Sequence, residues 1–142
     1  ESCTGGWLGQ IVTSISGSSA WYQSGFITYT ASSKQEMLGI SAKTIKEYGE
    51  VSEQTAQEMA HGAAIRSGVQ VAVSITGIAG PGGGTMNKPV GMVCFAWEIK
   101  DNHTRSATRH FSGDRKAVRQ QAVAVAMQGL IDLLRDTNYS VA

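Results

Sequence analysis

A hydroxyl, a thiol and two glycines open the chain, in the run Glu1-Ser2-Cys3-Thr4-Gly5-Gly6. Tyr29 and Lys34 follow, five residues apart. A serine becomes a strong nucleophile when a neighbouring base, such as a neutral lysine, takes its proton. The histidines lie far downstream and none stands in a triad-like motif, so the lysine is the better candidate activator. The residue types therefore favour a hydrolase with Ser2 as nucleophile and Lys34 as base.

The basicity of Lys34 depends on where its helix begins. Ser33 stands three residues before Glu36, a spacing typical of a capping box, so we expect a short helix to begin there and continue through Met37 and Leu38. Lys34 is then the first helical residue, where the helix dipole and partial burial both disfavour an ammonium. Both effects favour a neutral amine. The alternative from the residues alone is an exposed lysine with an ordinary pKa.

Two neighbours of Ser2 have possible roles of their own. Gly5 and Gly6 stand at the mouth of a helix expected over 7–16, where backbone N–H groups can form an oxyanion hole. The alternative is that Ser2 is an ordinary helix-entry serine. Cys3 is a rival nucleophile, but no histidine is adjacent in sequence to activate it.

Glycines crowd into one loop, residues 76–85, directly after an apolar strand expected over 71–75. They are Gly77, Gly80, Gly82, Gly83 and Gly84. A P-loop would need a lysine after Gly84, and a dinucleotide fingerprint would need a helix where Asn87-Lys88-Pro89 leads into another strand. What remains is a loop whose backbone N–H groups can bind an anion or a flat ligand, or a merely tight connection.

Arg115 and Arg119 stand four residues apart in the first turns of a helix expected over 114–135. They share one face beside the positive end of the helix dipole, an arrangement that suits a phosphate monoester. The alternative is a solvated basic face.

Composition limits the classes of partner. The 142 residues fit a single domain, 1–142, with 42% hydrophobic residues, 16% charged residues and a net charge of +1. This charge predicts no nucleic-acid or membrane partner. Two cysteines, Cys3 and Cys94, make no disulfide framework and stand in no metal-ligand spacing. We find neither a membrane-spanning apolar run nor a signal peptide, so we expect a cytoplasmic protein.

Helical and extended patterns alternate along the chain. Helices are expected over 7–16, 33–38, 41–49, 52–67 and 114–135, and strands over 26–29, 71–75, 90–99 and 104–111. The last two strands are joined by a turn at Asp101-Asn102, as in a hairpin. The pattern predicts an α/β fold: a three-layer α/β/α sandwich around a mixed, mostly parallel sheet, with the 71–75 strand central and one antiparallel hairpin.

Taken together, these segments resemble a known family, the CinA carboxy-terminal domains and their stand-alone form PncC. The resemblance covers nearly the whole chain and keeps the family order. Its segments are ESCTGG (1–6), GSSAW (17–21), Tyr29 to Lys34, GEVS (49–52), TGIAGPGGG (76–84), KPVG (88–91) and GDRKAVRQQA (113–122). Family members usually carry a helix and a strand before ESCTGG, and an Asn where this chain has Ala31.

The resemblance implies hydrolysis of the carboxamide of nicotinamide mononucleotide, giving nicotinate mononucleotide and ammonia, with no metal and no cofactor. It implies that Ser2 is the nucleophile and Lys34 the base, and that Ser19 and Tyr29 complete their hydrogen-bond network. It also implies a substrate site in which the two arginines bind the phosphate. A homodimer is a further plausible implication. The substrate-site candidates are Thr4, Gly5, Gly6, Thr76, Gly77, Gly80, Gly82, Gly83, Gly84, Arg115 and Arg119.

Two other functions stay open. One is a non-catalytic, ligand-binding accessory paralogue linked to competence or DNA damage. The other is an amidase for a related nicotinamide or phosphoribosyl substrate.

Overall fold

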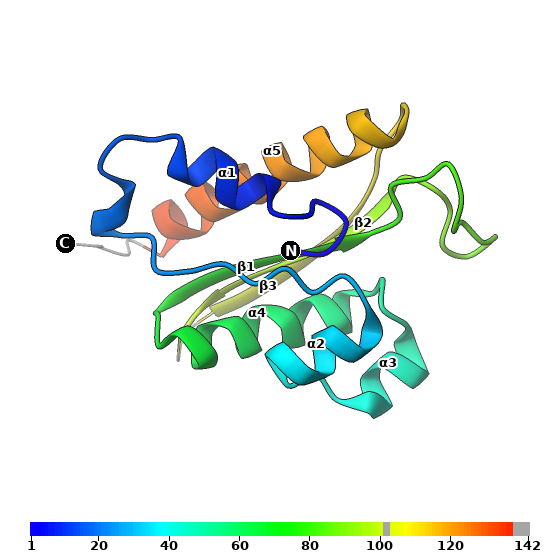
Figure 1. The fold of residues 1–142 in the computed structure, drawn as a ribbon, viewed down its shortest axis with the longest axis horizontal. Helices are drawn as coiled ribbons and strands as arrows, with labels where there is room; N and C mark the ends of the chain where they lie inside the picture. The colour runs from blue at the N-terminus through cyan, green and yellow to red at the C-terminus, as the bar shows by residue number, and fades with distance from the viewer. Residues whose placement is uncertain (101–102, 138–142) are drawn as a thin grey trace.

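The computed structural model describes residues 1–100 and 103–137, which form an α/β fold (Figure 1). Its elements, in chain order, are α1 (Trp7–Thr13), a 3-10 helix η1 (Ser18–Ala20), α2 (Ala31–Leu38), α3 (Ala42–Tyr48), α4 (Glu53–Ser67), β1 (Val71–Gly77), β2 (Met92–Ile99), β3 (His103–His110) and α5 (Arg115–Asp136). The helices expected after Ser41, Ser52 and Asp114 begin at those caps, because each side chain accepts a hydrogen bond from the first helical turn.

The sheet is antiparallel throughout the described residues, in the order β1-β2-β3. The expectation of a mixed, mostly parallel sheet with the 71–75 strand central is therefore wrong, because β2 is the central strand. A parallel neighbour would need a crossover helix, whereas β1 returns to β2 through the glycine loop with no helix between them. The hairpin of β2 and β3 is confirmed. The turn expected at Asp101-Asn102 lies outside the described residues.

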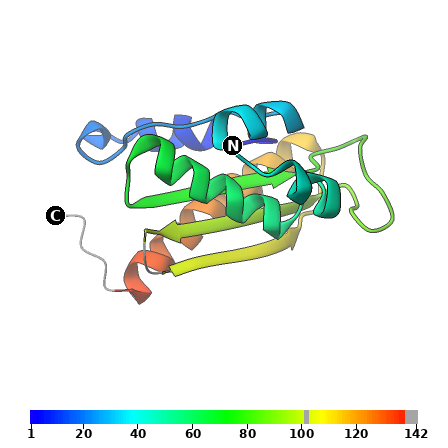
Figure 2. The same ribbon diagram turned by 90° about the horizontal axis from the view of Figure 1, so that it is seen from below.

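Helices cover both faces of the sheet. Figure 1 shows α1 and α5 on one face and α2, α3 and α4 on the other, and Figure 2 shows the three strands between them. The central strand, β2, contributes side chains to the core on both faces, because successive side chains of a strand point to opposite faces of the sheet. Phe95 and Trp97 pack in the cluster that includes Val118 and Ala122 of α5, while Cys94 and Ala96 pack in the cluster of Ala56 and Ala60 on α4.

The amino-terminal residues lie beside β1. Ser2 N donates to Ile75 O of β1 at 3.0 Å, and Thr28 N donates to Glu1 O at 2.9 Å. The Glu1 ammonium donates to Phe26 O at 2.7 Å. The expectation of a strand over 26–29 is wrong, because this segment pairs only with Glu1 and belongs to no sheet ladder among the described residues. These contacts fix Ser2 near the carboxyl end of β1.

Candidate active site

Lys34 and Ser2 meet inside the protein. Lys34 Nζ lies 2.9 Å from Ser2 Oγ and donates to Thr28 O at 2.7 Å. Lys34 is 0% exposed and Ser2 is 7% exposed, so bulk water does not compete strongly for either group. The two residues are 32 positions apart, and the fold brings them to hydrogen-bonding distance. This contact is the geometry that a base and its nucleophile require.

Burial is the main influence on the charge of Lys34. It lowers the pKa of the amine from its ordinary value, and the nearby Glu50 carboxylate partly opposes that effect. The expectation that Ser33 caps the helix is wrong, because Thr30 is the N-cap and Ser33 completes the capping box from the third helical position. Lys34 is therefore the fourth helical residue, farther from the dipole end than expected. Desolvation thus favours the neutral amine.

Cys3 is poorly suited to act as the nucleophile. Its side chain is buried, and burial raises the pKa of the thiol to about 11. A thiol attacks as the thiolate, which is scarce at neutral pH when the pKa is this high. The environment therefore favours Ser2 over its neighbour.

The backbone donors around the first helix are largely occupied. The Glu1 carboxylate accepts from Gly6 N at 3.2 Å and from Leu8 N and Gly9 N at 2.9 Å each, while Gly5 N donates to Ser2 O. Gly5 and Gly6 are thus unavailable as the oxyanion donors that the sequence suggested. Within the described residues, the N–H of Thr4 has no acceptor.

Arg119 braces the segment that carries Ser2. Its Nε donates to Cys3 O at 2.9 Å and a terminal nitrogen donates to Thr4 O at 3.2 Å. The guanidinium also lies 5.4 Å from the ring centroid of Trp7, a cation–π contact. Arg119 therefore contacts the segment that carries Ser2 and does not present a free guanidinium to a phosphate.

Arg115 joins Tyr29 to the glycine loop. One terminal nitrogen donates to Gly80 O at 2.8 Å, and the other donates to Tyr29 Oη at 2.9 Å. Tyr29 is 56% exposed, and its hydroxyl contacts Arg115 and not Lys34 among the described residues. Arg115 and Tyr29 thus form an accessible polar pair at the amino-terminal end of α5.

The glycine loop leaves β1 from a buried base and reaches the surface. Thr76 is fully buried and donates through its hydroxyl to Glu50 O at 2.9 Å. Beyond the buried Gly80, the glycines at 82, 83 and 84 are exposed. Only the inner part of the loop therefore lies against the rest of the site.

Glu50 is a neighbour of Lys34 that the sequence did not identify. Its Oε1 lies 3.8 Å from Lys34 Nζ. The one available signal was its place in the segment 49–52, which the family resemblance included without a role. Lys34 and Glu50 are separated in the sequence by a helix and several turns. No rule of residue spacing therefore predicts their contact.

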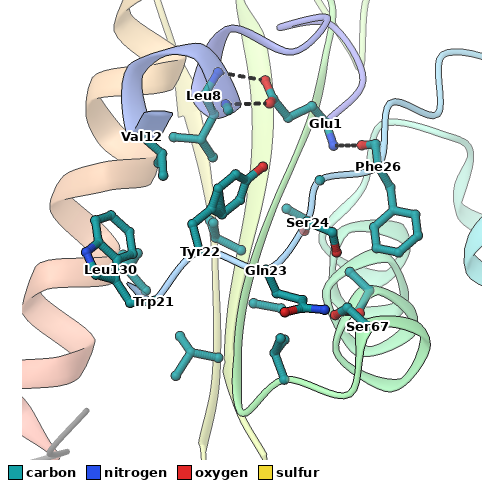
Figure 3. A pocket seen from close by; sticks show the side chains of 18 of the residues that line it. Glu1, Leu8, Val12, Trp21, Tyr22, Gln23, Ser24, Phe26, Ser67 and Leu130 are labelled. Carbon is teal, nitrogen blue, oxygen red and sulfur yellow. Dashed lines mark hydrogen bonds between the residues drawn. The ribbon is translucent and has the colours of Figure 1, made fainter. Parts of the chain in front are cut away.

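Ser19 lies apart from this cluster. It is exposed in η1, and within the described residues its side chain makes no hydrogen bond with Ser2, Lys34 or Tyr29. It lines a different pocket of about 660 Å³, whose surroundings include Tyr22 and Leu130 (Figure 3). Most of this pocket is apolar, and the structure does not bring Ser19 together with the Ser–Lys pair.

The described residues offer neither a metal-binding cluster nor a membrane-spanning helix. Residues 1–100 and 103–137 contain no group of three or more His, Cys, Asp or Glu side chains arranged to hold a metal ion. Over the same ranges, every helix is too short or too polar to cross a bilayer.

Known proteins resemble this chain over most of its length. A nicotinamide-nucleotide amidohydrolase PncC from Enterobacter agglomerans is 51% identical over 128 residues, covering 90% of this chain and 78% of that relative. A protein of the same name from Escherichia coli K12 is 48% identical over 130 residues, covering 92% and 79%. The crystal structure of competence/damage inducible protein CihA from Agrobacterium tumefaciens superposes with a TM-score of 0.90 at 44% identity, covering 93% of this chain and 81% of that one.

A family model agrees with these relatives. The model described as the CinA C-terminal domain matches residues 1–134, almost the whole chain. The residues brought together here, from Ser2 to Arg119, all lie inside the match. This chain therefore belongs to the family of CinA C-terminal domains.

Proposed function

We propose that this protein hydrolyses the carboxamide of nicotinamide mononucleotide, releasing ammonia and nicotinate mononucleotide. The observation that carries the proposal is the buried 2.9 Å contact between Lys34 Nζ and Ser2 Oγ. Relatives that are about half identical to this chain are named nicotinamide-nucleotide amidohydrolases, which supports the choice of substrate.

In the first half of the reaction, Lys34 takes the proton of the Ser2 hydroxyl while Oγ attacks the carboxamide carbon. The carbonyl oxygen becomes an oxyanion, for which the N–H of Thr4 is our candidate donor. The ammonium of Lys34 then returns a proton to the amide nitrogen, the C–N bond breaks, and ammonia leaves. The product is an ester between the nicotinoyl group and Ser2.

Water completes the reaction. Lys34, neutral again, takes a proton from a water molecule that attacks the ester carbon, and the same proton returns to Ser2 as the C–O bond breaks. One water is consumed, and Ser2 and Lys34 end as they began. Low exposure of both side chains supports this assignment, because a neutral lysine is favoured where water is excluded.

We assign substrate binding to the more exposed side of the site. Arg115, Tyr29 and the loop from Thr76 to Gly84 offer donors for the phosphate and ribose of a nucleotide. Arg119 acts mainly by holding Cys3 and Thr4. Independence from metal, a homodimer and a cytoplasmic location are further parts of the proposal, and light scattering tests the dimer.

The test is ammonia release from nicotinamide mononucleotide in the presence of a chelator, for this protein and for Lys34→Ala. We expect turnover that the substitution abolishes. Turnover that persists in Lys34→Ala would exclude Lys34 as the base. No turnover by the unmutated protein, together with binding of the nucleotide in calorimetry, would favour the ligand-binding alternative.

A further inference from the structure

The amine of Lys34 has three oxygen neighbours. Ser2 Oγ lies at 2.9 Å, Thr28 O at 2.7 Å and Glu50 Oε1 at 3.8 Å. The first is the nucleophile of the proposed function and the second is a backbone carbonyl. The third is a carboxylate to which the reaction above assigns no step. We propose that Glu50 is a positioning residue that directs the Lys34 amine toward Ser2 and stabilises the ammonium formed during attack.

The hydrogen-bond inventory of a lysine explains the directing role. A neutral amine has two N–H donors and one lone pair, and an ammonium has three N–H donors. When Thr28 O and Glu50 attract the two N–H groups of the neutral amine, the lone pair is left facing the Ser2 hydroxyl. After proton transfer, the third N–H faces Ser2 Oγ. The same three oxygens therefore suit both states that a base must adopt.

The turn that carries Glu50 is firmly held. The hydroxyl of Thr76, on β1, donates to Glu50 O at 2.9 Å. Thr55 and Ser52 donate to the preceding carbonyl, Gly49 O, at 2.7 and 3.2 Å. Thr76 and Thr55 are fully buried. Buried side chains from two elements thus hold the backbone that carries Glu50, and its half-exposed carboxylate lies 3.8 Å from the buried lysine.

Cys3 and Glu1 are the other titratable residues to compare with Glu50 near Lys34. Cys3 has a thiol whose pKa is raised to about 11, so it is neutral at physiological pH. The amino group of Glu1 is positive when protonated, and its pKa is lowered mainly by burial, with a further lowering by the charge of Lys34. The Glu1 carboxylate is bonded to the first turn of α1. Glu50 is thus the anion, among the described residues, that opposes the loss of charge at Lys34.

The inference rests on the proposed function for its role in attack, but the charge effect can be measured without substrate. The first experiment follows the Lys34 Nζ resonance by NMR across pH in protein labelled at lysine, for the unmutated chain and for Glu50→Gln. The signal is assigned by its loss in Lys34→Met. Because the Glu50 charge raises the pKa of Lys34, we expect a lower pKa in Glu50→Gln. An equal or higher pKa would overturn the proposal.

A matched control separates a local effect from a change in net charge. Glu47→Gln removes the same charge from an exposed position three residues away, with no hydrogen bond or ion pair among the described residues. We expect it to leave the pKa of Lys34 unchanged. Glu50→Asp keeps the charge on a shorter side chain and should give a pKa between those of the unmutated chain and Glu50→Gln. Equal shifts in the Glu47 and Glu50 variants would overturn the proposal.

The kinetic experiment tests the role in attack. In Glu50→Gln we expect kcat/KM to fall on the order of fivefold, as for loss of a partly exposed ion pair, and its acid limb to move to lower pH. A purely structural residue would lower activity without moving that limb. If the unmutated protein has no deamidase activity, the proposed function fails, while the NMR titration still decides whether Glu50 sets the charge of Lys34.

Discussion

The Ser2–Lys34 pair and the glycine loop both adjoin the carboxyl end of β1, yet they are built in opposite ways. The pair lies in the interior, with Lys34 held by Thr28 O and Ser2 held by Ile75 O. The loop reaches the surface, where Met86 is 97% exposed. A buried group has one well-defined position and a strongly perturbed environment, whereas an exposed loop can adapt to a ligand. We expect substitutions in the first region to change kcat and those in the second to change KM.

Removing the base tests the first half of this comparison and should have the largest effect. We expect Lys34→Met to lower kcat by on the order of 10³, because the proposed mechanism uses the amine as the base and the later proton donor. KM for the nucleotide should change little. Lys46→Met, at an exposed position on α3, is the matched control and should keep full activity. Steady-state kinetics of both variants measure these effects. A kcat of Lys34→Met close to that of the unmutated protein would contradict the assignment of the buried pair as the catalytic centre.

The same variant gives a stability test whose sign follows from the lowered pKa. Lys34 binds a proton less readily in the folded chain than in the unfolded one, so its contribution to the free energy of unfolding rises with pH toward its unfolded pKa, about 10.4. The Met variant lacks this dependence. The free energy of unfolding of the variant minus that of the parent should therefore fall as pH rises from 7 to 10. Urea unfolding across this range measures it, and a constant difference would contradict the lowered pKa.

The pH dependence of the unmutated protein follows from the same group. Protonation of Lys34 removes the base, so kcat/KM should fall as pH falls through the pKa of Lys34 in the folded protein. Because burial lowers that pKa, the acid limb should lie well below the ordinary lysine value of about 10.4. A rate profile with a limb at the ordinary value would show that Lys34 is not desolvated in the active enzyme.

Arg119 holds the segment that carries Ser2, and its removal should have the second largest effect. Arg119→Gln removes the donors to Cys3 O and Thr4 O, and we expect kcat to fall on the order of tenfold to a hundredfold because positioning of the nucleophile is lost. Lys116→Gln removes an exposed charge from the same helix and serves as the control. A rise in KM alone would instead indicate that Arg119 binds the substrate.

The open side is tested by Arg115. We expect Arg115→Ala to raise KM by on the order of tenfold with little change in kcat, because it removes a charged donor beside Tyr29 and Gly80. Tyr29→Phe removes the hydroxyl that Arg115 contacts and should give a smaller change of the same kind. A large loss of kcat in Tyr29→Phe would place this hydroxyl in the proton transfers, although within the described residues it contacts Arg115 and not Lys34.

Two glycines of the loop give a smaller and closely matched comparison. A Cβ at Gly80 would lie 2.4 Å from a methyl carbon of Val90, and its φ of +85° disfavours other residues. A Cβ at Gly82 would meet nothing within 4 Å. We expect Gly80→Ala to raise KM a few-fold, on the order of threefold, and Gly82→Ala to leave it unchanged. Equal effects would mean that the loop's shape does not matter for binding.

Ser19→Ala tests whether the active site extends as far as Ser19. Ser19 is exposed on η1 and lines the separate pocket shown in Figure 3. We expect the variant to keep kcat and KM within about twofold, as for most surface substitutions away from a site. A loss of kcat comparable with that of Lys34→Met would restore Ser19 to the hydrogen-bond network that the sequence suggested.

The sequence by itself determined the local features of this protein. Side chains that cap their own helices, such as Ser41, Ser52 and Asp114, act over three residues, so their pattern is legible in the chain. The alternation of β2 and the run of helix α5 are equally local. The family segments, including ESCTGG and TGIAGPGGG, also pointed to Ser2, Lys34 and the glycine loop as the candidate site.

Tertiary structure decided what depends on distant contacts. The order of the strands, with β2 in the centre, is set by pairing between distant residues, whereas the lack of an expected helix between 71–75 and 90–99 already indicated that these two strands are antiparallel. Arg119 became a brace and Glu50 a neighbour of Lys34 because α5 and the turn before α4 pack near the amino terminus. Burial of Lys34, the physical reason for its lowered pKa, arises only when the residues around Ser2, Thr28 and Glu50 pack against it. Desolvation is a property of the packed core, and residue spacing alone cannot specify it.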